Sequence, residues 1–142
     1  MLESAAAEQA IYLLIDNAAI TGLTGIYSGM SKEASTRPCV IFQQATSTDW
    51  TCNDRSSMGM TFQYLVEVFA DGETFPHGLA AQVHNAINNQ SATITVSESG
   101  LSDTDWIVDI IRVRSVSNPD EFQGHEIRKS GGLYRVTVRS AA

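Results

Sequence analysis

The segment TFQYLVEVFA, from Thr61 to Ala70, decides the fold class because its side chains alternate in polarity with a period of two. Apolar residues occupy every second position: Phe62, Tyr64, Val66, Val68 and Ala70. Polar residues dominate the other face, although Leu65 and Phe69 also lie there. This pattern predicts a β-strand with one buried face and a second face that is partly covered.

The sequence before this strand predicts a second strand and a helix. Pro38–Ala45 is rich in β-forming residues, and the polar stretch Thr46–Met60 after it predicts a loop, so the two strands would form a long antiparallel hairpin. Ser4–Ile20 repeats apolar residues at helical spacing, with Gly22 as a stop signal. The intervening stretch Gly22–Arg37 contains several glycines and predicts an irregular connection.

The sequence after Ala70 predicts one more helix, followed by two or three strands. Pro76 suits the first turn of that helix, which ends near Asn88. A change of parity between Ile110 and Ile111 indicates a β-bulge in the longest strand. The expected elements are a short strand at Ile94–Val96, a strand over Trp106–Val116, a polar loop over Ser117–Gly132 and a final strand over Leu133–Arg139.

The order of these elements limits the architecture. The first two strands cannot be parallel neighbours joined by a crossover helix, because no helix lies between them. We therefore expect one α+β domain over residues 1–142, with an antiparallel or mixed sheet of four to five strands, two helices packed on one face, and long loops.

Composition excludes several function classes for this chain of 142 residues. Apolar residues make up 43% and charged residues 18%, which is too apolar for a disordered chain. No apolar run reaches the ~18–20 residues of a membrane span, and no signal-peptide pattern opens the sequence. The formal net charge of −7 argues against a protein that binds nucleic acid through a broad phosphate-contacting surface.

The charge is unevenly distributed along the chain. Residues 1–111 carry thirteen acidic and three basic side chains, whereas residues 112–142 carry three acidic and six basic ones. Such polarity can steer one copy of a chain toward another, or toward a charged partner. The alternative interpretation is that strands near the C-terminus simply present arginines to solvent.

The sequence offers little for catalysis or metal binding. His77 and His84 lie two helical turns apart without further ligands, and His125 is isolated in a predicted loop. Two cysteines, Cys39 and Cys52, are too few for a zinc site. The glycine-rich stretch after the first helix lacks the lysine of a phosphate loop, and no serine has a nucleophile-elbow pattern. We therefore expect no enzyme, no cofactor and no metal site.

The three predicted loops are unusually long, at roughly 15 residues where connections in compact domains average about 4–6. Large apolar residues in long loops are common at partner surfaces, although they can equally pack back on their own core. The set favours a protein that is completed by binding neighbours. The residues concerned are Tyr27 and Met30 in the first loop, Trp50 and Met58 in the second, and Phe122 in the third.

A series of short motifs follows in a distinctive order along the chain. They are Gly25-Ile26-Tyr27, Pro38-Cys39-Val40-Ile41-Phe42, Val66-Glu67-Val68-Phe69-Ala70, Ile111-Arg112-Val113-Arg114, a loop with His125, and Tyr134-Arg135-Val136-Thr137-Val138. In this order the chain resembles the tail terminator (tail completion) proteins of long-tailed bacteriophages and related gene transfer agents. The similarity covers nearly the whole chain, with Ser91–Asp105 longer than the family pattern.

The resemblance implies a structural role in the neck of a virion, assembled in the host cytoplasm. Such proteins form rings, usually hexamers, on the head-proximal end of a finished tail tube, where they end polymerisation and meet the head connector. The implied partners are further copies of the chain, the tail tube protein, a head-completion or connector protein, and double-stranded DNA that passes through the bore without sequence-specific binding. No membrane is involved.

Candidate interface residues are large aromatic, methionine and arginine side chains, which commonly anchor protein interfaces. Two other functions stay open: a head-to-tail connector or other neck protein of the same particle, and a small α+β ligand-binding or enzymatic domain. The interface candidates are Trp50, Arg55 and Met58 in the hairpin loop, Phe122 and His125 in the late loop, and the charged contacts Arg112, Arg114, Arg135 and Arg139.

Overall fold

The computed structural model describes residues 2–29, 38–51, 57–71, 77–97, 104–122 and 125–140. Two helices and six strands lie within these residues. In chain order they are α1 (Leu2–Asn17), β1 (Ile26–Ser28), β2 (Cys39–Thr51), β3 (Ser57–Asp71), α2 (His77–Ile87), β4 (Gln90–Val96), β5 (Thr104–Phe122) and β6 (His125–Ser140).

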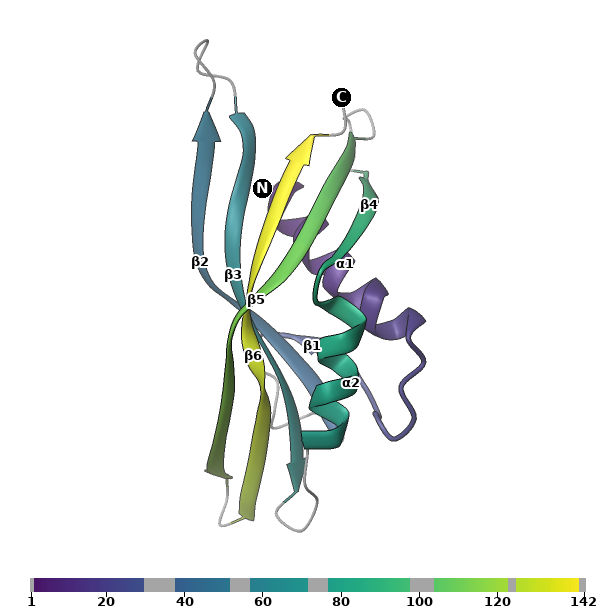
Figure 1. The fold of residues 1–142 in the computed structure, drawn as a ribbon, viewed down its shortest axis with the longest axis vertical. Coiled ribbons are helices and arrows are strands. Elements are labelled where there is room, and N and C mark those ends of the chain that lie inside the picture. The colour runs from purple at the N-terminus through teal and green to yellow at the C-terminus, as the bar shows by residue number, and fades with distance from the viewer. Residues whose placement is uncertain are drawn as a thin grey trace.

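The six described strands form one sheet in the order β1-β2-β3-β6-β5-β4 (Figure 1). β1 and β2 are parallel, and every other neighbouring pair is antiparallel. The α+β class with a mixed sheet is therefore confirmed, whereas the predicted number of four to five strands is wrong. The additional strand, β1, lies inside the stretch predicted to be irregular and is too short for polarity to alternate recognisably. It pairs with Val40, Ile41 and Phe42.

Two long hairpins replace two of the predicted loops. Pairing of β2 with β3 extends to Thr51 and Ser57, and β5 remains paired with β6 to its last residue. The predicted loops Thr46–Met60 and Ser117–Gly132 are therefore largely strand. Their polar sequences lack the apolar alternation from which a strand is predicted, but backbone hydrogen bonds between strands form regardless of side-chain polarity.

A register shift in β5 lies between Arg112 and Arg114. The predicted bulge therefore exists, but it follows the expected position, because Ile111 continues the regular alternation as an exposed residue. The pair Gly131-Gly132 of β6 lies opposite β5 at this level. A Cβ at Gly131 would collide with the carbonyl oxygen of Val66 on β3, so the strands approach each other closely there.

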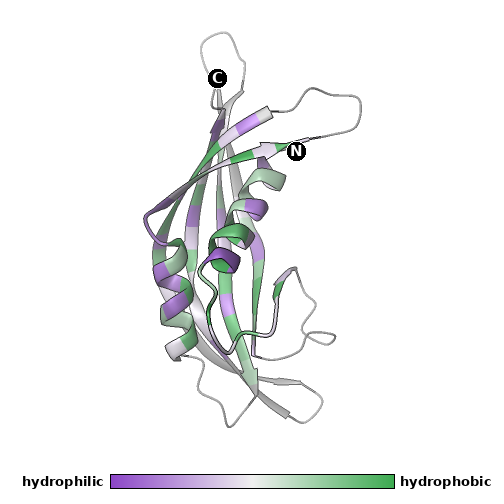
Figure 2. Ribbon diagram, turned by 90° about the vertical axis from the view of Figure 1, so that its right-hand side faces the viewer, coloured by the Kyte–Doolittle hydropathy of each residue, from purple (hydrophilic) through white to green (hydrophobic). Residues whose placement is uncertain are grey.

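Both helices contribute side chains to one buried cluster with alternate residues of the sheet. The five apolar side chains predicted to share a face of β3 are all buried, which confirms the alternation. In Figure 2, hydrophobic and hydrophilic segments alternate along the ribbons. We call this side of the sheet the core face. Its members include Ala7, Ile11 and Ile15 of α1, Val83 and Ile87 of α2, and Phe62, Tyr64, Val108, Ile110, Tyr134 and Val136 of the strands.

The opposite face of the sheet is partly covered at one end, as Leu65 and Phe69 predicted. Phe69 is buried with Cys39 and Ile41 in a second cluster, against which Tyr27 packs. Glu67 is also buried, with 3% of its surface exposed. No helix among the described residues is long and apolar enough to cross a membrane.

Candidate functional site

The two groups of predicted loop residues lie at opposite ends of the sheet (Figure 1). Trp50 pairs with Gly59 near the tip of the β2–β3 hairpin, and Gly59 pairs on its other side with Arg139 of β6. Phe122 and His125 pair with each other at the tip of the β5–β6 hairpin. Met58 lies on β3 near the first tip, and Arg55 lies outside the described residues. The fourteen residue-to-residue steps of β6 from His125 to Arg139 would span roughly 45 Å if fully extended.

The register shift in β5 sends two predicted interface arginines to different faces. Residues directly opposite each other in a sheet share a face. Arg112 pairs with Tyr134 on the core face, whereas Arg114 pairs with Leu133 on the opposite face. Without a bulge, two residues separated by one position would point the same way. The four arginines therefore do not form one group.

A patch on the opposite face combines charge with exposed apolar surface. We call Asp109, Ile111, Arg135 and Arg139 the outer patch. Asp109 accepts a hydrogen bond from the Ser91 hydroxyl, and its Oδ2 lies 3.9 Å from Nε of Arg139. Ile111 pairs with Arg135 and is 42% exposed.

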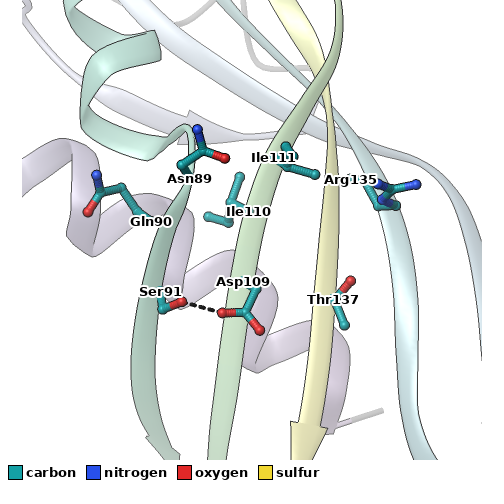
Figure 3. A pocket seen from close by; sticks show the side chains of 8 residues that line it. All are labelled: Asn89, Gln90, Ser91, Asp109, Ile110, Ile111, Arg135 and Thr137. Atoms are coloured by element: carbon teal, nitrogen blue, oxygen red, sulfur yellow. Dashed lines mark hydrogen bonds between the residues drawn. The ribbon is translucent and has the colours of Figure 1, made fainter.

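An open cavity of about 330 Å³ lies at the outer patch (Figure 3). Asp109, Ile111 and Arg135 line it, together with residues of the turn into β4. An exposed isoleucine beside an arginine and an aspartate gives this surface apolar area and charges of both signs. Two of the predicted interface residues, Arg135 and Arg139, thus belong to one surface.

A carboxylate on α1 ties the helix to two strands. Ser28 Oγ donates a hydrogen bond of 2.7 Å to Glu8 Oε1, and Tyr64 Oη donates one of 3.2 Å to Glu8 Oε2. Burial raises the pKa of the Tyr64 hydroxyl well above its usual value, and the negative charge of Glu8 raises this pKa further. The raised pKa favours the protonated hydroxyl, which can donate to Glu8; we call this group, which joins α1 to β1 and β3, the Glu8 clamp.

A second polar group lies on the core face between α2 and the last two strands. His84 Nδ1 is 2.9 Å from Tyr134 Oη. Burial lowers the pKa of His84, and the nearby cation of Arg112 lowers it further. Burial raises the pKa of Tyr134, while the charge of Arg112 and its hydrogen bond to the hydroxyl oppose that rise. The pKa of each group is thus shifted in the direction that favours its neutral form.

The described residues contain no cluster of three histidine, cysteine, aspartate or glutamate side chains that could hold a metal ion. His77 is the first residue of α2 and His125 the first residue of β6. Cys39 is a buried thiol in the second cluster, and Cys52 lies outside the described residues.

Comparison with known proteins assigns no family: no protein-family model matches the sequence, and no curated protein matches it. The structural groups that the sequence left unassigned are Glu8–Tyr64 and His84–Tyr134. Their partners are 56 and 50 residues apart, respectively. Only the position of each tyrosine on a buried, alternating strand signalled that its hydroxyl needs a partner.

Proposed function

We propose that the chain is a tail terminator subunit, which forms a ring on the head-proximal end of a phage tail tube. The ring, a hexamer by the resemblance, ends tube polymerisation and provides the joint to the head connector. In this proposal both helices cover the core face of the sheet, and the outer patch on the opposite face contributes to subunit contacts. The role is association, and no reaction is catalysed.

The observation that carries the proposal is a sheet with two unlike edges. Residues 43–51 of β2 have β3 as their only strand partner among the described residues, because the pairing of β2 with β1 ends at Phe42. At the far edge, β4 has β5 as its only described strand partner. A closed ring requires that one surface of each subunit meet a different surface of the next. Two unlike edges on one sheet supply such a pair of surfaces.

The charge and the outer patch agree with this role. An acidic chain lets DNA phosphates pass through a bore without binding them, and a basic C-terminal segment offers contacts to the acidic body of a neighbour. Arg135 and Arg139 lie on β6, close to β4 across β5. The outer patch therefore lies beside one of the two open edges.

The test is assembly with a tail tube protein encoded by the same genome. Tubes polymerised with the chain present should carry a ring at one end and stop at a defined length in negative-stain electron micrographs. A chain that decorates only the head connector and leaves tubes to grow would instead be a neck protein of the same particle. A chain that binds neither tubes nor connectors, and remains a monomer, would refute both roles.

A matched pair of variants links the result to the outer patch. Ile111→Lys places a charge on the proposed contact surface, and Leu13→Lys places the same charge on an α1 residue of similar exposure, 41% against 42%. We expect Ile111→Lys to abolish ring formation and Leu13→Lys to preserve it. Equal effects from the two variants would show that the outer patch is not a subunit contact.

A further inference from the structure

A cavity of about 350 Å³ lies between α2 and the strands β5 and β6, on the core-face side of Arg112. Polar side chains from all three elements line it: His84 and Asn85 of α2, Arg112 and Ser115 of β5, and Ser130 of β6. None of its nine described lining residues is acidic. The described lining therefore presents one guanidinium and no carboxylate.

Local backbone features place Arg112 at this cavity. Arg112 pairs with Tyr134 just before the register shift, so its side chain lies on the core face. Gly132 makes room for it, because a Cβ there would lie 3.0 Å from Arg112 Cδ. The backbone N–H of Arg112 donates a hydrogen bond of 2.9 Å to Asn88 Oδ1, which joins β5 to the C-terminal end of α2. The backbone and stem of Arg112 are therefore held in place, although the residue as a whole is exposed.

His84 and Tyr134 meet at the cavity, where His84 Nδ1 lies 2.9 Å from Tyr134 Oη. An imidazole that accepts from the hydroxyl at Nδ1 carries its hydrogen on Nε2. In that tautomer His84 offers the cavity an N–H donor beside Arg112.

We propose that this cavity binds an oxyanion group, a phosphate or a carboxylate carried by a small molecule. The guanidinium of Arg112 supplies charge and paired N–H donors, which match the geometry of both groups. His84, Asn85 and Ser115 add neutral donors around it. The cavity is within the size range of small-molecule sites, so the oxyanion is one end of a larger ligand. This inference concerns the single subunit and does not rest on ring formation.

The test is a titration of the full-length chain with inorganic phosphate and, separately, with acetate, each at constant ionic strength made up with chloride. Nitrogen and proton NMR signals of the His84 imidazole report occupancy directly, and they also report the Nε2–H tautomer. We expect saturable shifts with at least one of the two anions. Saturation by phosphate alone assigns a phosphorylated ligand, and saturation by acetate alone assigns a carboxylate; saturation by both supports the oxyanion site without selecting between them.

Two neighbouring arginines provide the matched control. Arg112→Gln removes one charge from the cavity, and Arg114→Gln removes one charge from the opposite face of the same strand. Loss of a charge-assisted hydrogen bond should weaken binding at least about tenfold in Arg112→Gln, whereas Arg114→Gln should bind as the unmodified chain does. Asn85→Asp, at an exposed helix position, should also abolish binding by placing a carboxylate at the cavity.

Absence of saturation with both anions would overturn the proposal. Equal weakening by Arg112→Gln and Arg114→Gln would also overturn it, because the anions would then respond to overall charge rather than to this cavity. If Arg112→Gln fails to fold, as judged by its NMR dispersion, Asn85→Asp decides the question. Retained binding in that variant would contradict the site.

Discussion

Ile110 and Ile111 are adjacent residues of the same type on β5, yet the sheet uses them differently. Ile110 faces the core and is 2% exposed, whereas Ile111 faces outward and is 42% exposed. The core face holds nearly all the large buried side chains, and they specify the fold. Among the described side chains of β5 and β6, the opposite face contributes none to the two buried clusters. Ile111 on that face is exposed beside Arg135, and the proposed function assigns it to a subunit contact.

The same comparison divides the arginines. Arg112 and Arg114 are two positions apart, and the register shift between them places one on each face. Arg112 joins a hydrogen-bonded group at a cavity, and Arg114 joins the face that carries the outer patch. Two residues that look equivalent in the sequence are therefore expected to serve different interactions.

The largest effect on stability is expected from truncating the two isoleucines. Ile110→Ala leaves a void in the core and should lower the free energy of unfolding by about 2–5 kcal/mol. Ile111→Ala removes an exposed side chain and should change it by less than about 0.5 kcal/mol. Urea unfolding of the monomeric chain measures both. Similar losses from the two variants would contradict the assignment of faces.

The next largest effect concerns the close approach of β6 and β3. Gly131→Ala introduces a Cβ against the carbonyl oxygen of Val66 and should cost about 1–3 kcal/mol. The control is Gly78→Ala in α2, where nothing lies within 4 Å of the new Cβ. This change should be neutral or stabilise the helix by up to about 1 kcal/mol. Thermal unfolding compares the two, and a neutral Gly131→Ala would refute the close approach.

A smaller effect is expected for the clamp on α1. Tyr64→Phe deletes a buried hydroxyl that donates to Glu8 and should lower the free energy of unfolding by about 1–2 kcal/mol. Tyr12 is 44% exposed on the same helix as Glu8, so Tyr12→Phe should have no measurable effect. Denaturant unfolding distinguishes them. If both substitutions are neutral, the Glu8 clamp does not stabilise the fold.

The smallest effect is a pH dependence that arises from His84. Its pKa in the folded chain is lowered below the ordinary 6.5 by burial and by the cation of Arg112, with Tyr134 as its uncharged neighbour on β6. The unfolded chain therefore binds more protons as the pH falls below 6.5, and the folded state loses stability through that window. The effect is modest because His84 is only half-buried.

His84→Gln removes this titration and isolates it from that of the carboxylates. Relative to His84→Gln, the unmodified chain should lose stability as the pH falls from about 7.5 to about 5.5. Urea unfolding at both pH values measures this difference. A difference that stays constant, or that favours the unmodified chain in acid, would contradict a neutral His84 in the folded state.

The sequence predicted the elements that alternate against a buried core. The strand predicted over Thr61–Ala70 lies within β3, and the apolar stripes predicted both helices. The hairpin arms were predicted as loops because a polar strand is stabilised by its neighbour's backbone, which the local sequence does not reveal. β1 was missed because three residues, Ile26–Ser28, form a strand only where β2 provides a partner.

The candidate site shows the same limit. Arginines near the C-terminus were predicted as contacts from residue type and charge alone, and two of them lie on the outer patch. Arg112 and Arg114 lie on different faces because the bulge is between them. The parity of the apolar residues indicates a bulge at Ile110–Ile111 instead. The His84–Tyr134 contact joins a helix and a strand 50 residues apart, so no local pattern could predict it.

The most direct test of the central proposal is the mass of the assembled protein. Native mass spectrometry of the purified chain, alone and after mixing with tail tubes, measures how many copies associate. The proposal predicts a closed ring of one defined stoichiometry, at six times the 15.4 kDa chain mass for a hexamer, either in solution or on the tube end. A chain that stays at 15.4 kDa in both conditions, with no affinity for tubes, would contradict it.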